Sequence, residues 1–146
     1  MACKKTIIIA GKDEKDRKNL TSLLREDYNI LEADGSGSAM EIMEENTSTA
    51  AAAILDITFN IQGGIKLLSA LKRKENISKI PIIVITGKSD EKTELAVLEA
   101  GASDYIHKPF NFKVLKKRLE NIIKWNENIA VARHIKKDNL TGVYTE

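Results

Sequence analysis

Short apolar segments rich in β-branched residues recur five times along the chain, separated by stretches long enough to form helices. They occupy residues 6–10, 28–33, 51–56, 80–86 and 105–107. Segments of this length and composition, bounded by polar and glycine-containing stretches, are typical of β-strands. We expect 51–56 and 82–85 to be the most buried strands, because they are continuously apolar rather than alternating.

The stretches between these strands carry apolar residues at helical spacing. Leucines at positions 20, 23 and 24 fall within 13–27, and similar stripes occur in 36–45, 64–74 and 90–100. Gly101 follows the last stripe, as expected where a helix ends. Strands and helices that alternate in this way predict an α/β fold, in which helices cover both faces of a doubly wound parallel sheet.

The last predicted helix is longer than a domain of this size needs. It begins at Phe112 and runs to about residue 137 without proline or glycine. Alternating steps of four and three connect Leu115, Leu119, Ile122, Asn126, Ile129 and Arg133. Apolar residues at this spacing with one Asn indicate a dimeric coiled coil, although Arg133 interrupts the stripe. The alternative is a solvated terminal helix whose end frays; in both cases its first half packs on the sheet.

Composition narrows the class of protein. The chain is 42% hydrophobic and 30% charged, which suits a globular domain. Its net charge of +2 gives no argument for nucleic-acid binding, and no apolar run is long enough to cross a membrane. Cys3 is the single cysteine, so no disulfide can form within the chain. We therefore expect a cytoplasmic protein that binds neither nucleic acid nor a membrane.

Polar residues of complementary chemistry follow three of the predicted strands. Asp56 ends the third strand, Thr86 ends the fourth, and Lys108 follows the fifth. The carboxyl ends of parallel strands meet at one edge of the sheet, where ligands bind. A carboxylate can act as a nucleophile, while an ammonium and a hydroxyl stabilise an oxyanion. This set suits covalent acceptance of a phosphoryl group.

Three stretches resemble the receiver domains of bacterial two-component response regulators. They are LDITFNIQGGIKLL (55–68), PIIVITGKSD (81–90) and AGASDYIHKPF (100–110). The resemblance covers about residues 4–125 and implies a flavodoxin-like sheet of five parallel strands in the order 2-1-3-4-5, with an extended C-terminal helix. It also implies a regulatory, non-enzymatic domain that receives phosphate from a sensor histidine kinase.

The resemblance assigns roles to individual residues. Asp56 matches the phosphoacceptor, and Thr86 and Lys108 match the hydroxyl and the ammonium that contact the phosphoryl group. Tyr105 matches the aromatic residue whose ring turns inward or outward when the receiver domain switches between its two states. Pro109 matches a proline whose preceding peptide bond is commonly cis.

The first predicted strand departs from the family pattern. Receiver domains usually end this strand with two acidic residues that hold magnesium, but Gly11 and Lys12 stand here. The remaining candidate ligands for Mg²⁺ are Asp56, the backbone carbonyl of Thr58 and, as a weak ligand, Asp13. An ammonium a few ångströms away would oppose the cation by a few kcal/mol even at an effective dielectric of about 20. We expect Mg²⁺ to bind weakly.

Three interpretations of Lys12 remain open. In the first, its ammonium folds over Asp56 and replaces the metal. In the second, it points to solvent and the domain is a phosphate-independent dimerisation or docking module. In the third, it is an ordinary loop lysine and Asp13 sustains a weak metal site. A flavodoxin-like nucleotide or flavin binder is disfavoured, because the sequence has no GxxxxGK[ST] phosphate-binding loop.

The segment DNLTGVYT (138–145) resembles the opening of GGDEF domains, which make cyclic di-GMP. The predicted organisation is a receiver domain at 1–125, a helical coiled-coil linker at 126–137 and the start of an output domain at 138–146. The leading hypothesis is a receiver domain that controls a GGDEF output domain by forming a homodimer through its last helix. The contrasting hypothesis is a pseudo-receiver that acts only through protein contacts. The chain carries no cyclase residues, so we expect no cyclase activity.

Overall fold

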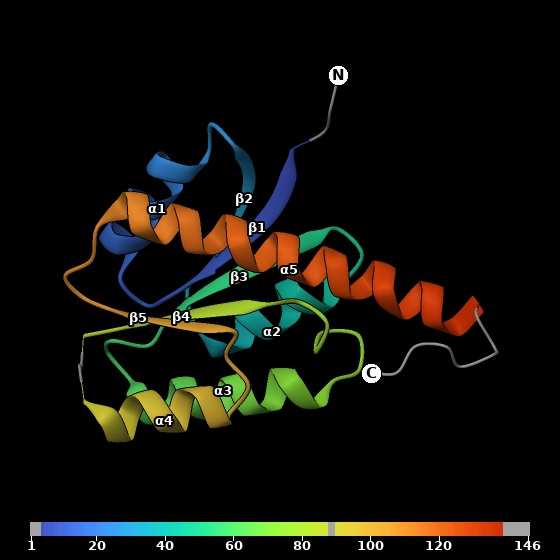
Figure 1. The fold of residues 1–146 in the computed structure, drawn as a ribbon. Coiled ribbons are helices and arrows are strands. Elements are labelled where there is room, and N and C mark those ends of the chain that lie inside the picture. The colour runs from blue at the N-terminus through green and yellow to red at the C-terminus, as the bar shows by residue number, and fades with distance from the viewer. Residues whose placement is uncertain (1–3, 88–89, 139–146) are drawn as a thin grey trace.

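The computed structural model describes residues 4–87 and 90–138. In this part of the chain strands and helices alternate throughout (Figure 1). The elements are β1 (Lys5–Ala10), α1 (Glu14–Leu24), β2 (Tyr28–Ala33), α2 (Ser36–Glu45), β3 (Ala50–Asp56), α3 (Ile61–Arg73), β4 (Ile82–Thr86), α4 (Glu91–Glu99), β5 (Asp104–His107) and α5 (Phe112–Asp138). The strands form one parallel sheet in the order β2-β1-β3-β4-β5, which confirms the expected topology.

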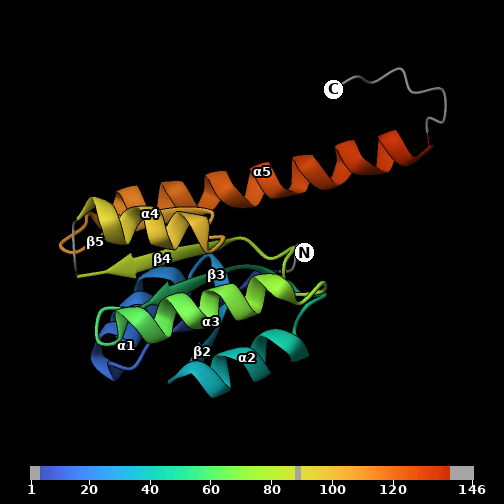
Figure 2. The same ribbon diagram turned by 90° about the horizontal axis from the view of Figure 1, so that it is seen from below.

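Helices cover both faces of this sheet. Helices α1 and α5 lie on one face, and α2, α3 and α4 lie on the other (Figures 1 and 2). Successive side chains of a strand point to opposite faces. Ile7 and Ile9 accordingly pack against α1 and α5, whereas Ile8 packs against the opposite layer. The doubly wound arrangement is therefore confirmed.

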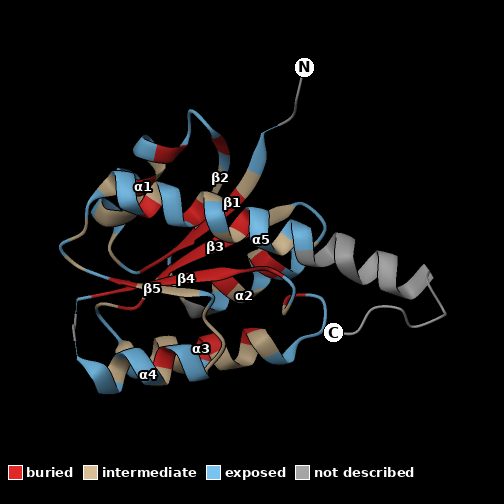
Figure 3. Ribbon diagram, in the orientation of Figure 1, coloured by how far each residue is buried: buried red, intermediate tan, exposed pale blue. Residues whose placement is uncertain are grey.

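The central strands are the most buried elements (Figure 3). Strands β3 and β4 are buried as expected, and Ile82, Ile83, Val84 and Ile85 are all fully buried. Strand β1 is buried to the same degree at residues 7–9, which the apolar pattern did not predict. The reason is its place between β2 and β3, because strand order, rather than strand composition, determines which strands have neighbours on both sides.

Helix α3 begins three residues earlier than the apolar stripe predicts. The Asn60 side chain caps it by accepting a hydrogen bond from the Gly63 backbone N–H at 2.9 Å. At Gly64 a Cβ would lie 2.1 Å from Cγ2 of Ile57, so only glycine lets this helix approach the end of β3 so closely. The first turn of α3 is thereby held beside the strand end that carries Asp56.

Helix α5 is 27 residues long, close to the predicted length. Leu115, Leu119 and Ile123 are buried against the sheet, and the helix then continues beyond it (Figures 1 and 2). The predicted linker, 126–137, is thus continuous with the packed part of the helix. The side chains of Ile129 and Arg133, like the GGDEF-like residues 139–146, lie outside the described residues. The coiled coil stays a prediction.

Across the described ranges, no helix combines the length and the apolar character that a membrane span requires.

Candidate functional site

The predicted polar residues lie at neighbouring strand ends of the sheet. Asp56 is the last residue of β3, Thr86 is the last residue of β4, and Lys108 follows β5. The parallel register pairs Asp56 with Ile85, and Thr86 with His107. The edge predicted to bind a ligand therefore carries a carboxylate, a hydroxyl and an ammonium from three different strands.

The Asp56 carboxylate is fixed by contacts to both of its oxygens. Oδ1 accepts hydrogen bonds from the Thr58 backbone N–H at 3.0 Å and from the Thr58 hydroxyl at 2.6 Å. Oδ2 lies 2.9 Å from Nζ of Lys108. The Asp56 side chain is only 9% exposed, so these charge-assisted contacts act where water screens them little. The carboxylate is oriented before any ligand arrives.

Lys108 contacts a second carboxylate that the sequence did not lead us to expect. Its Nζ lies 2.8 Å from Oδ2 of Asp16 on α1. Burial alone lowers the pKa of Lys108, but the hydrogen bonds to Asp16 and Asp56 outweigh burial, so the pKa is raised. The same contact, chiefly through its hydrogen bond, lowers the pKa of Asp16. Lys108 is a charged bridge between two carboxylates.

One signal in the sequence could have revealed Asp16. It precedes Leu20 and Leu24 by four and eight residues, so it lies on the face of α1 that these buried leucines define. An acidic residue that continues an apolar stripe toward the strand-end edge is a candidate for the site. Asp16 and Lys108 are 92 residues apart, and only the packing of α1 and α5 on the same face brings them together.

The other predicted contact residues lie on the β4–β5 side of the site. Thr86 is fully buried, and its backbone carbonyl accepts a hydrogen bond from the Lys108 N–H at 2.8 Å. The peptide bond between Lys108 and Pro109 is cis, as the resemblance led us to expect. Tyr105 is half-buried; burial, and then the charges of Glu94 and Asp90 near α4, raise its pKa. Their parts in a switch stay predictions.

Strand β1 ends directly beside Asp56. A Cβ at Gly11 would lie 3.1 Å from Cβ of Asp56, a contact tight enough that a neighbour would have to yield. The Gly11 carbonyl accepts a hydrogen bond from Nη1 of Arg17 at 2.6 Å, and Arg17 in turn pairs with Glu32. This anchoring holds the β1 end against the carboxylate, at the place where the resemblance expects acidic metal ligands.

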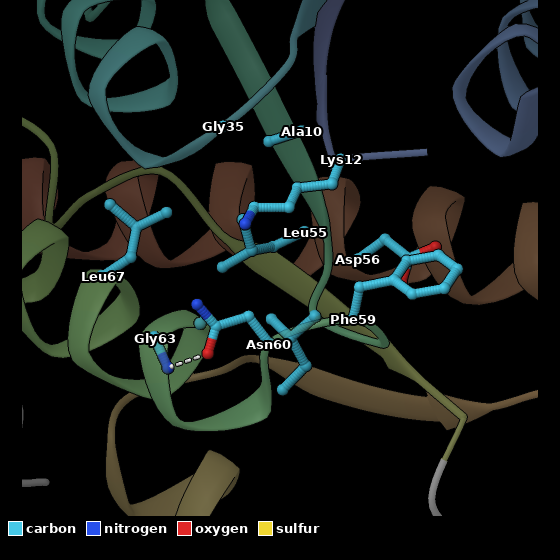
Figure 4. A pocket seen from close by; sticks show the side chains of 12 residues that line it. Ala10, Lys12, Gly35, Leu55, Asp56, Phe59, Asn60, Gly63 and Leu67 are labelled. Carbon is cyan, nitrogen blue, oxygen red and sulfur yellow. Dashed lines mark hydrogen bonds between the residues drawn. The ribbon is translucent and has the colours of Figure 1, made fainter. Parts of the chain in front are cut away.

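Lys12 does not take part in this network. It is exposed and lines a pocket with Asp56, Asn60 and Gly35. Figure 4 shows its side chain turned away from Asp56, toward the side of the pocket where Leu67 lies. Within residues 4–87 and 90–138 no ion pair involves Lys12. The interpretation in which Lys12 folds over Asp56 is therefore wrong, because Lys108 occupies that place.

The side chains at this edge do not fit a magnesium ion. Mg²⁺ demands near-octahedral oxygen coordination and usually takes one or two carboxylates. Asp13 is the residue before α1 and has an extended backbone without a side-chain capping hydrogen bond. Gly11 has no side chain, and the carboxylates of Asp16 and Asp56 share Lys108. No group of three acidic, His or Cys side chains suited to a metal occurs in the described part of the chain. The part of Asp13 as a weak metal ligand stays a prediction.

Proteins similar to this chain are two-component signalling proteins. The family model for the response regulator receiver domain matches residues 7–120. The phosphate regulon transcriptional regulatory protein PhoB of Pseudomonas aeruginosa is 33% identical over 121 residues, which are 82% of this chain and 52% of PhoB. Histidine kinase P4 of Formosa agariphila is 32% identical over 142 residues, 94% of this chain but 10% of the kinase. The chain thus spans about half or less of these relatives.

Solved structures share the fold. A response regulator receiver domain protein from Clostridium thermocellum superposes with a TM-score of 0.77 at 22% identity, covering 86% of this chain and 98% of that one. NtrX from Brucella abortus, solved in complex with ADP, gives 0.81 at 22% identity, covering 98% of this chain and 31% of NtrX. The Mn²⁺-bound form of response regulator Rcp1 gives 0.65 at 22% identity, covering 81% and 91%. The chain belongs to the response regulator receiver domain family of two-component signalling.

Proposed function

We propose that Asp56 accepts a phosphoryl group from a sensor histidine kinase and that the chain is the receiver of a phosphorelay. The observation that carries this proposal is the contact between Asp56 and Lys108, at 2.9 Å, around a carboxylate that is 9% exposed. A nucleophile that is fixed, and paired with a cation able to neutralise the incoming charge, suits phosphoryl transfer. Thr86, buried at the next strand end, supports the same reading.

The transfer step follows from these groups. An oxygen of Asp56 forms a bond to phosphorus, while the bond between phosphorus and the donor nitrogen of a phosphohistidine breaks. The electron pair of that bond leaves with the imidazole, which takes up a proton. Lys108 neutralises charge on the phosphoryl oxygens and the Thr86 hydroxyl donates a hydrogen bond to one of them. The product is an acyl phosphate on Asp56.

In this proposal the cation of the site is Lys108 rather than a metal. Receiver domains generally bind Mg²⁺ at an acidic pocket, and the Rcp1 structure is Mn²⁺-bound. Gly11 and Lys12 supply no carboxylate here, and the described residues do not fit the ion. We therefore propose an atypical pocket whose charge the chain balances itself.

The output of the switch is carried by α5. The helix packs on the sheet through Leu115 and Leu119 and continues past it without a break. A change at the strand-end edge that shifts α5 would be transmitted along this rigid element. We propose that α5 connects the receiver to a cytoplasmic output domain, a GGDEF diguanylate cyclase according to the resemblance of 138–145, and regulates it through homodimerisation of the helix. The sequence of the gene beyond residue 146 tests the identity of that domain.

A second candidate function is the pseudo-receiver, which signals only through protein contacts. It is favoured by the contacts of Lys108, whose ammonium is paired with both Asp16 and Asp56 at 2.8 and 2.9 Å. It is also favoured by the missing carboxylates at Gly11 and Lys12. In this alternative the network is a structural element that fixes one state of the domain.

Phosphorylation by a small donor separates the two functions. The protein is incubated with millimolar phosphoramidate, and its intact mass is followed together with that of Asp56→Ala. The proposed function predicts the addition of one phosphoryl group to the wild type and none to Asp56→Ala. As a matched control, Asp34→Ala removes an exposed carboxylate at the end of β2 and should leave the modification unchanged. An unmodified wild type would instead support the pseudo-receiver.

A further inference from the structure

The fold places Asp16 as close to Lys108 as it places Asp56. The two carboxylates lie at nearly equal distances from Nζ, 2.8 Å for Asp16 and 2.9 Å for Asp56. Asp16 is placed by α1, which is anchored through the buried leucines on the same helix face, Leu20 and Leu24. Because α1 is fixed by its core contacts, the Asp16 carboxylate is presented to Lys108 by the scaffold rather than by a mobile loop.

This placement matters when charge arrives at Asp56. The acyl phosphate carries about 1.5 to 2 negative charges at neutral pH. It replaces a carboxylate of charge −1, so roughly 0.5 to 1 negative charge is added at Asp56. The ammonium of Lys108 is in contact with Asp56, but it contacts Asp16 at an equally short distance. Asp16 also brings its own negative charge to the shared ammonium. Both effects oppose the accumulation of negative charge at Asp56.

We propose that Asp16 is a positioning residue that acts through Lys108 and restrains phosphoryl acceptance at Asp56. The inference rests on the proposed function. In the unphosphorylated domain Asp16 keeps the ammonium between two carboxylates. When Asp56 receives the phosphoryl group, Nζ exchanges its contact with Asp16 for contacts with phosphoryl oxygens. Removal of the Asp16 charge leaves Lys108 available to the phosphoryl group from the start.

The test is a double-mutant cycle on the initial rate of phosphorylation by phosphoramidate. Its members are the wild type, Asp16→Asn, Lys108→Ala and the double variant. We expect Asp16→Asn to raise the rate by roughly 3- to 10-fold, the size of one partly screened charge at short range. The increase should vanish when Lys108 is already alanine, because Asp16 acts through that ammonium.

Two further variants exclude a general effect of charge or of helix stability. Glu14→Gln removes an equal charge from the first turn of the same helix, where Glu14 is exposed, and should leave the rate within about 2-fold of the wild type. Asp16→Glu keeps the carboxylate, so its phosphorylation rate should stay closer to that of the wild type than to that of Asp16→Asn. If Asp16 had only a structural role, Asp16→Asn would change the phosphorylation rate by the same factor with and without Lys108.

The outcomes separate this inference from the proposed function. A phosphorylated wild type with an unchanged rate in Asp16→Asn overturns the inference alone. An increase that persists without Lys108, or that Glu14→Gln reproduces, also overturns it. Absence of modification in both proteins would overturn the restraint together with phosphoacceptance at Asp56.

Discussion

The two sides of the strand-end edge use the same residue type in opposite ways. On the β3–β5 side, Lys108 bridges Asp16 and Asp56, and its side chain is 27% exposed. On the β1 side, Lys12 is exposed and forms no ion pair within the described ranges. Both lysines line one edge of one sheet, so position alone does not determine their function.

The difference lies in what the scaffold places around each ammonium. Lys108 meets carboxylates from β3 and from α1, two elements that the core holds in place. Lys12 follows Gly11, which has no side chain to offer, and its nitrogen is turned from Asp56 (Figure 4). The β3–β5 side is therefore a preorganised charged site, whereas the β1 side lacks the ligands that a cation would need.

The largest effect is expected from returning carboxylates to the β1 side. The double variant Gly11→Asp/Lys12→Asp adds two ligands and removes an ammonium near Asp56, so Mg²⁺ affinity should rise by roughly two orders of magnitude. Isothermal titration calorimetry measures this affinity. Lys12→Ala removes the ammonium without adding a ligand, so its gain should stay below about tenfold. Wild-type affinity equal to that of the double variant would contradict the contrast between the two sides.

The next largest effect is on stability and compares the two lysines directly. Lys108→Ala leaves two carboxylates without their shared cation and should lower the free energy of unfolding by about 1.5–3 kcal/mol. Lys12→Ala should change it by less than about 0.5 kcal/mol, because the lost side chain is exposed and forms no ion pair with the residues that the structure describes. Urea denaturation followed by circular dichroism measures both values. Equal losses of unfolding free energy in the two variants would show that Lys108 contributes no more to stability than Lys12.

The smallest effect is a dependence of stability on pH. The pKa of Asp16 lies below its ordinary value of 3.8, mainly through the hydrogen bond with Lys108. Its contribution to stability is therefore complete above pH 3.8 and is lost as the pH falls through the lowered pKa. Asp16→Asn should reduce the acid dependence of the unfolding free energy, by under about 1 kcal/mol since the pair is partly exposed. If the unfolding free energy of wild type and variant depends on acid pH in the same way, the contact between Asp16 and Lys108 does not stabilise the fold.

Much of the fold follows from local patterns in the sequence. Each predicted strand lies within two residues of an observed one, because β-branched runs bounded by polar stretches report local burial. Gly101, with a φ of 115°, confirms the predicted end of α4. The burial of β1 was missed, because it depends on strand order and not on the composition of the strand.

The site was predictable only in part. Asp56, Thr86 and Lys108 could be named because each lies at the end of a strand, and parallel strands bring their ends to one edge. The helix face of α1 makes Asp16 a candidate, but its contact with Lys108 could not be predicted, since the contact spans 92 residues and exists only because α1 and α5 cover the same face. The direction of the Lys12 side chain is likewise a tertiary property, which no local pattern encodes.

The rate of Asp56 phosphorylation as a function of Mg²⁺ concentration tests the central claim most directly. The wild type and Gly11→Asp/Lys12→Asp are compared with phosphoramidate as donor, from excess EDTA to millimolar Mg²⁺. We predict that the wild type is modified at Asp56 at a rate that does not depend on Mg²⁺, whereas the double variant becomes Mg²⁺-dependent. A wild type that is modified only when Mg²⁺ is present would contradict the claim that Lys108 serves as the cation of this site.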